Sequence, residues 1–215
     1  MHLTYYQDSN FYFFRKPAGM PSTFGKESSF LDHLIQHIDT NPIFQSLSAF
    51  FGTEKEFGLL NRLDNDTSGL LYFAKNPRAY REFKQLQRSF QLHKLYVAEV
   101  YGDITSFIAN NQLAISYPIA HHRYNPDRMV VIQSPEDEKK TKGHIHHVST
   151  SIIEFEFLPE TRTSVLLIQI TKGIRHQIRA HLASIGHPIC GDKIYTKSGG
   201  HTYDNLQLFS VGLSN

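Results

Sequence analysis

The stretch Leu59–Lys75 constrains the fold of this chain more than any other part of the sequence. It places a polar loop, Asn61–Gly69, before the apolar run Leu70–Ala74, which has the length and composition of a buried strand. Arg62 and Asp64 are separated by one residue, so in an extended backbone their side chains point to the same side. The sequence therefore predicts a carboxylate and a cation on a loop that is held against a core.

Composition alone gives this loop a simpler interpretation. Asp, Asn, Thr, Ser and Gly also build turns by hydrogen bonding to their own backbone, so a structural turn is the ordinary explanation. The order of the residues favours another, because Asn61–Lys75 resembles the His-Arg-Leu-Asp-x-x-Thr-Ser-Gly-Leu-Leu-x-x-Ala-Lys signature of the RluA-type RNA pseudouridine synthases. The resemblance implies that Asp64 is the nucleophile. Asn61 stands where the family usually has His, and the carboxylate is retained.

Two further segments resemble the same family. Asp8–Gly19 is similar to its opening motif, an acidic residue and an apolar strand followed by Lys-Pro-x-Gly, here Lys16–Gly19. Lys94, Tyr96 and Ala98 share one face of a predicted strand, where a tyrosine ordinarily packs in the core. Their spacing resembles the family's second signature, which implies that Tyr96 lies against the target uracil.

The segment Lys172–Tyr195 resembles the third signature, Thr-Gly-Arg-x-His-Gln-Ile-Arg-x-His followed by Gly-x-Pro-Ile-x-Gly-Asp-x-x-Tyr. Ile174 stands where that signature has its first arginine, and an arginine follows at Arg175. Arg179 matches the last arginine. A surface position is the ordinary explanation for an arginine, whereas the resemblance implies that Arg179 pairs with Asp64.

Hydrophobic periodicity and turn residues predict the other elements. Strands are expected at Phe11–Lys16, Leu70–Ala74, Leu92–Tyr101 and Thr163–Thr171, with a β-rich region over Gln112–Phe157. Helices are expected over Phe30–Ile38, from Pro77 with Asn76 as cap, and over Lys172–Leu182, where Arg175 and Arg179 would lie one turn apart. The pattern predicts loops, with a possible short helix, at 41–57 and an exposed charged loop at Pro135–Lys142.

The helix that begins at Pro77 carries a basic stripe. At about 100° per residue, four cations fall within an arc of about 120°: Arg78, Arg81, Lys84 and Arg88. Such a stripe is commonly just a solvated face, and the alternative is contact with phosphates of a polyanion.

Composition limits the class of protein. The chain has 215 residues, enough for one domain, and we expect a single catalytic domain spanning 1–215. Its net charge of +2 barely indicates a polyanionic partner, so the distribution of the cations matters more than their sum. Cys190 is the only cysteine, which excludes an intramolecular disulfide and fits a reducing compartment.

The amino end lacks the pattern of a signal peptide, and no run approaches the roughly 20 apolar residues that cross a bilayer. We therefore expect a soluble cytoplasmic protein without a membrane partner. Near the other end, Leu206–Ser210 resembles the start of the family's last strand, and the chain stops earlier than relatives usually do. One edge of the sheet is expected to be short, or the chain truncated.

A metal site is one alternative for the histidines. Alternation places His144 and His146 on one strand face, with His147 next to them. No carboxylate or cysteine stands at ligand spacing, so we expect no metal.

An aspartic protease is a second alternative, because Asp66–Gly69 spells the Asp-Thr-Ser-Gly loop of that class. Those sites need two such loops that share a proton between carboxylates, and this chain has one copy. The sequence therefore gives this alternative little support.

The resemblance covers nearly the whole chain, and it implies both fold and activity. The fold would be mixed α/β, of the α+β class, with a long, bent, mostly antiparallel sheet flanked by helices and crossed by a basic RNA-binding cleft. The activity would be isomerisation of specific uridines to pseudouridine in structured RNA, transfer or ribosomal. No cofactor is expected, since the reaction needs no redox centre or external electron sink.

The resemblance also assigns roles around the base. A uracil inside a stem must be flipped out to reach Asp64. Tyr96 would stack on it, Leu63 and Ile178 would form apolar walls, and Arg62 would occupy the space left behind. The basic stripe would hold the RNA backbone.

We expect a monomer that needs no obligatory protein partner. A different class remains open, a non-catalytic RNA-binding module that kept the fold and lost turnover. Asn61 and Ile174, the two departures from the signatures, motivate it.

Overall fold

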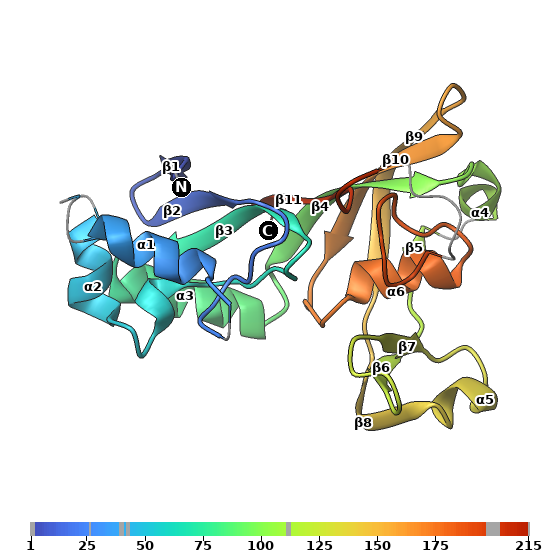
Figure 1. Ribbon diagram of the computed structural model, residues 1–215, viewed down its shortest axis with the longest axis horizontal. Coiled ribbons are helices and arrows are strands. Elements are labelled where there is room, and N and C mark those ends of the chain that lie inside the picture. The colour runs from blue at the N-terminus through green and yellow to red at the C-terminus, as the bar shows by residue number, and fades with distance from the viewer. Residues whose placement is uncertain are drawn as a thin grey trace. The chain divides into compact units, whose positions relative to one another are not determined.

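The computed structural model describes residues 3–25, 27–38, 41, 44–110, 113–196 and 203–214. Their contacts form two compact units, the first made of Met1–Leu92 with Phe209–Gly212, and the second of His93–Leu208 with Leu213–Asn215. The elements of both are labelled in Figure 1. A single domain over 1–215 stays a prediction. Gln112, the expected start of the β-rich region, lies outside the described residues.

The first unit combines a small sheet with helices (Figure 1). Its elements are β1 (Tyr5–Gln7), β2 (Phe11–Lys16), α1 (Phe30–Ile38), α2 (Gln45–Phe51), η2 (Glu56–Gly58), β3 (Ser68–Ala74), α3 (Pro77–Arg88) and part of β11 (Leu208–Ser214). The predicted strands and helices are confirmed here, and the segment 41–57 contains short helices as allowed for.

Pairing in this unit is antiparallel between β1 and β2 and between β2 and β3, and parallel between β3 and β11. Gly69 is required at the last of these pairings. Its φ is +113°, and a Cβ there would lie 2.2 Å from the backbone oxygen of Ser210 on β11. Any larger residue would therefore push β11 away from the start of β3.

Aromatic rings form the core of the first unit. Phe14 of β2 is fully buried, and its ring centroid lies 5.2 Å from Phe73, 5.3 Å from Phe44 and 5.9 Å from Phe30. Each buried side chain of this size contributes about 1.5–3 kcal/mol. This packing fixes β2 and β3 against α1, and with them the ends of the loop that precedes β3.

The second unit is mostly strand. Its elements are β4 (His93–Tyr101), α4 (Thr105–Ala109), β5 (Ala114–Ile115), β6 (Ile119–His122), β7 (Met129–Val131), α5 (Pro135–Glu138), β8 (Thr141–His146), β9 (Thr150–Leu158), β10 (Thr163–Ile170) and α6 (Gln177–Ser184). Strands β4, β10, β9 and β5 pair antiparallel in that order, and a smaller sheet has the order β7-β6-β8.

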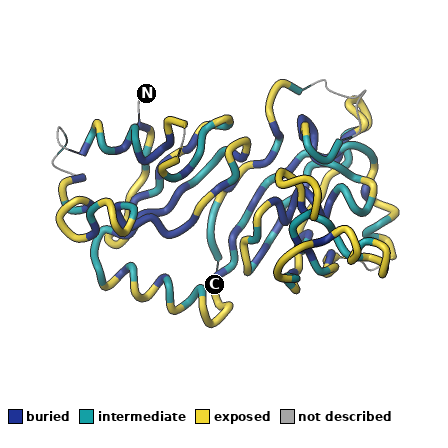
Figure 2. Tube along the Cα trace, turned by 60° about the horizontal axis from the view of Figure 1, so that its bottom comes forward, coloured by how far each residue is buried: buried dark blue, intermediate teal, exposed yellow. Residues whose placement is uncertain are grey.

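Burial follows the strands, while loops and outer helical turns are exposed (Figure 2). On β4, burial alternates strictly and covers Lys94, Tyr96, Ala98 and Val100, so the predicted shared face is confirmed. The mixed α+β class and the mostly antiparallel pairing are confirmed as well. The bend of the sheet and a basic cleft stay predictions.

Helix α6 differs from its prediction. It begins at Gln177 and not at Lys172, because His176 has a left-handed backbone with φ 53°. A turn precedes it, in which the backbone N–H of Gln177 donates to the carbonyl of Ile174. Arg175 therefore lies outside the helix, and its predicted one-turn spacing from Arg179 is wrong.

The charged segment Pro135–Lys142 also differs from its prediction as a loop. The Ser134 side chain accepts from the backbone N–H of Asp137 and caps the short helix α5. Strand β8 begins directly afterwards, at Thr141. Within the part of the chain that the structure describes, no helix has the length and apolar character needed to cross a membrane.

Candidate active site

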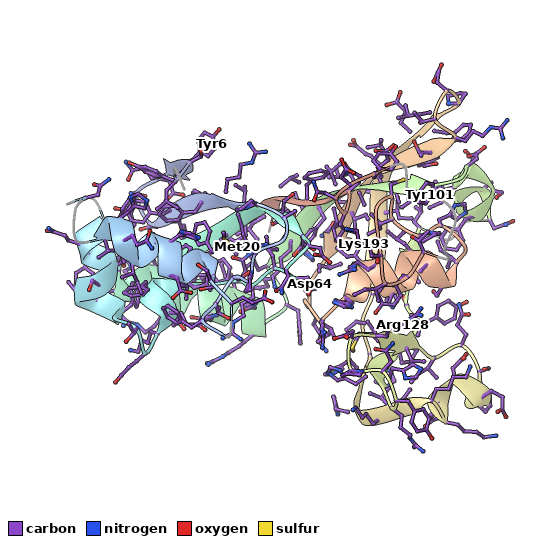
Figure 3. All side chains as sticks on the ribbon, viewed as in Figure 1. Tyr6, Met20, Asp64, Tyr101, Arg128 and Lys193 are labelled. Carbon is purple, nitrogen blue, oxygen red and sulfur yellow. The ribbon has the colours of Figure 1, made fainter. Side chains whose placement is uncertain are left out.

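The loop that carries Asp64 is held by its backbone. The Ser22 hydroxyl donates to the Leu63 carbonyl at 2.9 Å and accepts from the Leu63 N–H at 3.0 Å. The Asp64 carbonyl accepts from the N–H of Thr67. Leu63 is buried, Arg62 is exposed and Asp64 is half-buried, as the predicted alternation requires. Asp64 is labelled in Figure 3. The loop therefore buries its apolar side and turns the Asp64 carboxylate toward partial exposure.

Lys16 supports this loop from the interior. Its side chain is completely buried, and its Nζ donates to the carbonyls of Pro17, Met20 and Asn65 at 2.7–2.9 Å. Burial lowers the pKa of Lys16 to about 8, although the negative charges of Asp66 and Asp64 oppose that shift. By reciprocity, the ammonium group stabilises the ionised form of Asp64. Lys16 is a positioning residue of the Asp64 loop.

The departure at Asn61 has a structural explanation. The side chain is buried, and its Nδ2 donates to the carbonyl of Leu70 while its Oδ1 accepts from the N–H of Tyr72. An amide supplies a donor and an acceptor together, so it pairs with both groups of β3. Asn61 anchors the start of the loop to the strand that follows it.

Arg62 lies at the surface, with 67% of its side chain exposed, and its guanidinium pairs with Glu56 at 2.6 Å. Exposed pairs of this kind contribute about 0–1 kcal/mol. Arg62 can therefore leave Glu56 at little cost.

The basic stripe on α3 is only partly a solvated face. Asn76 caps the helix, as predicted, by accepting from the N–H of Ala79. Arg78 forms an exposed pair with Glu82, and Arg81 and Arg88 are exposed. Lys84 is half-buried, and its Nζ donates to the carbonyl of Leu60 at 3.2 Å, directly before Asn61. Burial lowers the pKa of Lys84. The stripe thus combines three exposed arginines with one lysine that holds the Asp64 loop.

In the second unit, Arg179 is not a surface arginine. It is 1% exposed, and its Nε and Nη2 donate to the two carboxylate oxygens of Asp192, both at 2.8 Å. Burial by itself would raise the pKa of Asp192, but the hydrogen bonds and charge of Arg179 outweigh it and hold that pKa below its usual value. The backbone N–H groups of Ile194 and Tyr195 donate to the same carboxylate. The bidentate pair fixes the plane of the guanidinium.

Tyr195 connects this ion pair to the smaller sheet. The Arg179 guanidinium lies 5.7 Å from the Tyr195 ring centroid. The phenol oxygen accepts from the N–H of Met129 on β7 and lies 3.1 Å from Nδ1 of His176. Burial, reinforced by the charges of Arg179 and Arg175, lowers the pKa of His176 to about 3. The imidazole is therefore neutral.

Two more residues of the third signature hold α6 in place. His181 is fully buried, its Nε2 donates to the carbonyl of Tyr117, and its Nδ1 accepts from the hydroxyl of Thr150. Gln177 donates to the carbonyl of Ser149. This segment therefore shapes the fold as well as supplying Arg179.

Each unit brings some of the predicted site residues together. Asp64, Arg62, Leu63 and the α3 stripe belong to the first unit, and Tyr96, Ile178 and Arg179 belong to the second, where all three are buried. The pairing of Arg179 with Asp64, and the convergence of both with Tyr96, stay predictions. Sequence reasoning gave no roles to Ser22 or Lys16 in the first unit, nor to Asp192 in the second.

The histidine pair on β8 is the alternative metal site. The rings of His144 and His146 meet edge to face with centroids 4.7 Å apart. Among the residues that the structure describes, no group of three or more His, Cys, Asp or Glu side chains is arranged to hold a metal ion.

Known proteins resemble this chain over most of its length. The model of the RNA pseudouridylate synthase family matches residues 10–184. The dual-specificity RNA pseudouridine synthase RluA of Vibrio vulnificus is 28% identical over 218 residues, which cover 97% of this chain and 75% of that protein. An uncharacterized RNA pseudouridine synthase of Aquifex aeolicus is 30% identical over 193 residues, 88% of this chain and 54% of that protein. The chain thus spans between about half and three quarters of these relatives.

A ribosomal large subunit pseudouridine synthase D, from Borreliella burgdorferi, is 30% identical over 200 residues, 91% of this chain and 55% of that protein. Among solved structures, human RNA pseudouridylate synthase domain containing 1 has a TM-score of 0.71 at 21% identity, covering 99% of this chain and 78% of that one. Human RNA pseudouridylate synthase domain containing 4 has a TM-score of 0.60 at 20% identity, with 97% and 82% coverage. These likenesses confirm the predicted fold.

Proposed function

Because this chain belongs to the RNA pseudouridylate synthase family, we propose that it isomerises uridine to pseudouridine in structured RNA, with Asp64 as the nucleophile. The observation that carries the proposal is the Asp64 loop itself. Its backbone is fixed by Ser22, Lys16 and Asn61, Asp64 itself is half-buried, and its negative charge acts on the buried Lys16 ammonium group. A carboxylate held in this way is preorganised for nucleophilic attack.

The reaction needs no external reagent. The bond between uracil N1 and ribose C1′ breaks, the base turns, a bond forms between C5 and C1′, and the proton on C5 leaves as N1 gains one. Asp64 forms the temporary bond to the sugar or the base, and it leaves when the new carbon–carbon bond is complete. Product and substrate are isomers, so the atoms and electrons balance.

Arg179 is the second charged group in this proposal. Asp192 holds its guanidinium in one plane, and the positive charge of Arg179 would favour the ionised form of the Asp64 carboxylate. Tyr96 supplies a buried aromatic ring from β4 for stacking and for help in removing the C5 proton. The proposal requires the two units to bring these groups to Asp64.

The target uridine would be flipped out of its stem, at a cost of a few kcal/mol. Leu63 and Ile178 would form apolar walls, and Arg62 would leave its exposed pair with Glu56 to fill the vacated space. The exposed arginines of the α3 stripe would contact phosphates without reading the sequence.

The choice of RNA rests on names alone. A relative named for the ribosomal large subunit favours ribosomal RNA, and transfer RNA is the alternative that the test includes. The monomeric state, the lack of an obligatory protein partner and the cytoplasmic location stay predictions.

Tritium release from RNA labelled at uridine C5 tests the activity, because release requires loss of the C5 proton. Asp64→Asn should abolish release from both ribosomal and transfer RNA while changing RNA affinity little. Asp66→Asn, in the same loop and exposed, is the matched control and should keep turnover. Full turnover by Asp64→Asn would remove Asp64 from the chemistry.

The non-catalytic RNA-binding module has one observation in its favour. Ile174, where the family signature has arginine, packs against the apolar cluster around Ile119, Met129 and Val148. A residue that contributes to the core there does not contact phosphate. RNA binding without tritium release by the unmodified protein would favour the module.

A further inference from the structure

A pocket of about 700 Å³ lies in the second unit, between β7, α6 and the segment that follows α6. Its lining is apolar at Met129, Val131, Ala180 and Ala183, and its two charged members are the cations Arg128 and Lys193. Neither Asp64, Tyr96 nor Arg179 lines it. The proposed function therefore gives this pocket no role.

The wall of the pocket is built from the rigid part of the unit. Tyr195, which also lines it, is fixed at its phenol by the N–H of Met129 and at its backbone by Asp192. Ala180 and Met129 belong to the buried apolar cluster behind the wall. These contacts fix Tyr195 and Met129 at the pocket wall.

Arg128 is held with its guanidinium over an aromatic ring. Its Cζ lies 5.2 Å from the centroid of the Tyr195 ring. The turn before it is tied down by Arg175, whose Nη1 donates to the carbonyl of Pro126 at 3.0 Å and whose Nη2 lies 3.8 Å from Asp127. Arg128 is itself exposed, so it presents an ordered cationic plane to the solvent (Figure 3).

These features fit one nucleotide of an RNA. Pockets of several hundred Å³ accommodate molecules of that size. Unpaired bases stack on arginine planes and aromatic rings, and phosphates are bound by lysine and arginine. A lining that combines apolar side chains with two cations and no acidic residue matches a base with its attached phosphate.

We propose that this pocket binds one nucleotide of the substrate RNA other than the target uridine. Its base packs on the apolar lining and the Arg128 plane, and its phosphate is held by Lys193 and Arg128. That the RNA is the substrate rests on the proposed function, whereas the binding of RNA in this pocket is tested separately.

The first experiment measures the affinity of the full chain for a fluorescein-labelled single-stranded oligouridine at several salt concentrations. The double variant Arg128→Gln/Lys193→Gln removes two positive charges from the pocket. Lys139→Gln/Lys140→Gln removes two from exposed ion pairs beside α5, outside the lining, and is the matched control. The pocket variant should bind at least about fivefold more weakly, and its salt slope should fall by about 0.7, since one phosphate contact on a single strand contributes about that much.

Equal loss in the two double variants, or none in either, would overturn the proposal, because the pocket would then add nothing to general electrostatic attraction. Lys193→Gln alone guards against a folding defect, since its side chain is exposed. It should weaken binding by at least about twofold and lower the salt slope by no more than about 0.7. Unchanged affinity in a folded Lys193→Gln protein would also count against the pocket.

The second experiment locates the RNA. Oligouridine carrying 4-thiouridine is crosslinked to the protein by light, and the attached peptides are identified by mass spectrometry. Crosslinks within Arg128–Val131 or Lys193–Thr196 support the pocket, and crosslinks confined to other segments overturn it. Full competition by uridine monophosphate at the concentration of the RNA would indicate a site for free nucleotides and would also overturn the proposal.

The third experiment separates this proposal from the proposed function. In the tritium-release assay, the pocket double variant should raise KM by a similar factor to its loss of affinity and leave kcat unchanged. If the unmodified protein releases no tritium, the proposed function fails, and the binding and crosslinking results still decide the pocket. If release is normal and KM is unchanged in the pocket variant, the pocket proposal fails alone.

Discussion

The two regions that supply the proposed catalytic groups are built in opposite ways. Asp64 sits on a loop whose backbone is held by other residues, Ser22 and Lys16, while its own carboxylate stays half-buried. Arg179 is completely enclosed, and its functional group is itself the structural contact, through a bidentate pair with Asp192. In the first region, the proposed reacting group belongs to one residue and the contacts that hold the loop belong to others. In the second region, the guanidinium of Arg179 serves both purposes.

This difference determines what substitutions should do. Removing the carboxylate of Asp64 takes away the proposed reacting group, while the contacts of Ser22 and Lys16 with the loop backbone stay in place. Removing either member of the Arg179 pair leaves a buried charge without its partner, which is among the costliest single changes in a protein. Stability and activity should therefore respond independently in the first region and together in the second.

The largest effect is expected for Asp192→Ala. It leaves the Arg179 guanidinium buried without its carboxylate and also removes the acceptor of two backbone N–H groups. We expect the free energy of unfolding to fall by about 3–5 kcal/mol, measured by urea denaturation. Asp127→Ala, at an exposed carboxylate of the same unit, is the control and should change it by less than about 0.5 kcal/mol.

A double change refines that test. Replacing both partners, as Arg179→Met with Asp192→Leu, should cost less stability than Asp192→Ala alone, because no unpaired charge remains. The double variant should nevertheless release no tritium from uridine-labelled RNA. A stable double variant with normal turnover would show that the pair serves the fold alone.

A smaller effect is expected for Lys16→Met. The variant leaves three carbonyls without their buried donor, at a cost of about 1–3 kcal/mol, and loosens the Asp64 loop. Turnover should fall together with stability. Lys55→Met, at an exposed lysine of the same unit, provides a control for the loss of a lysine charge, and equal effects of the two would contradict a special role for Lys16.

Lys16 also gives a pH dependence with a defined sign. Because burial lowers the pKa of Lys16 to about 8, the unfolded chain binds more protons than the folded one between about pH 8 and the ordinary lysine value of 10.5. The stability of the unmodified protein, relative to Lys16→Met, should therefore rise with pH across this window. A flat difference curve between the two proteins would contradict it.

His176 should make the stability of the protein depend on pH in the acidic range. Its pKa is lowered from 6.5 to about 3, so below about pH 6.5 the unfolded chain binds a proton that the folded chain excludes. Stability should fall as the pH drops through this range, and His176→Gln, which costs about 1 kcal/mol at neutral pH through its hydrogen bond to Tyr195, should flatten the fall. His147→Gln, at an exposed histidine, should keep the slope.

The sequence predicted the first region better than the second for a physical reason. The strand Leu70–Ala74, the cap at Asn76 and the exposed side of the Asp64 loop all follow from neighbours within a few residues. The supports of the loop do not, since Ser22 lies 41 residues from Leu63 and Lys16 lies 49 from Asn65. Contacts between residues so far apart in the sequence cannot be predicted from local patterns, and only the family motif gives information about them.

In the second region, periodicity gave a wrong result. The apolar spacing before Arg179 fits a helix that starts at Lys172, but the left-handed backbone of His176 delays the start to Gln177. A left-handed histidine is stabilised by its surroundings, here the contact with Tyr195 19 residues later. The burial of Arg179 depends on its ion pair with Asp192, 13 residues away in the sequence. Both residues lie in the segment that resembles the third signature, so their opposite charges were a clue to this pair.

The smallest effect expected is the stability change of Asp64→Asn, and it is the sharpest test of the contrast between the regions. The loop stays held through Leu63 and Asn65, and the amide removes one of two negative charges that favour the buried Lys16 ammonium, so the free energy of unfolding should fall by less than about 1 kcal/mol near pH 7. Urea denaturation of the unmodified protein, Asp64→Asn and the Asp66→Asn control measures it. A loss comparable to that of Asp192→Ala would mean that Asp64 is itself a structural contact, and the separation of chemistry from support in this loop would be wrong.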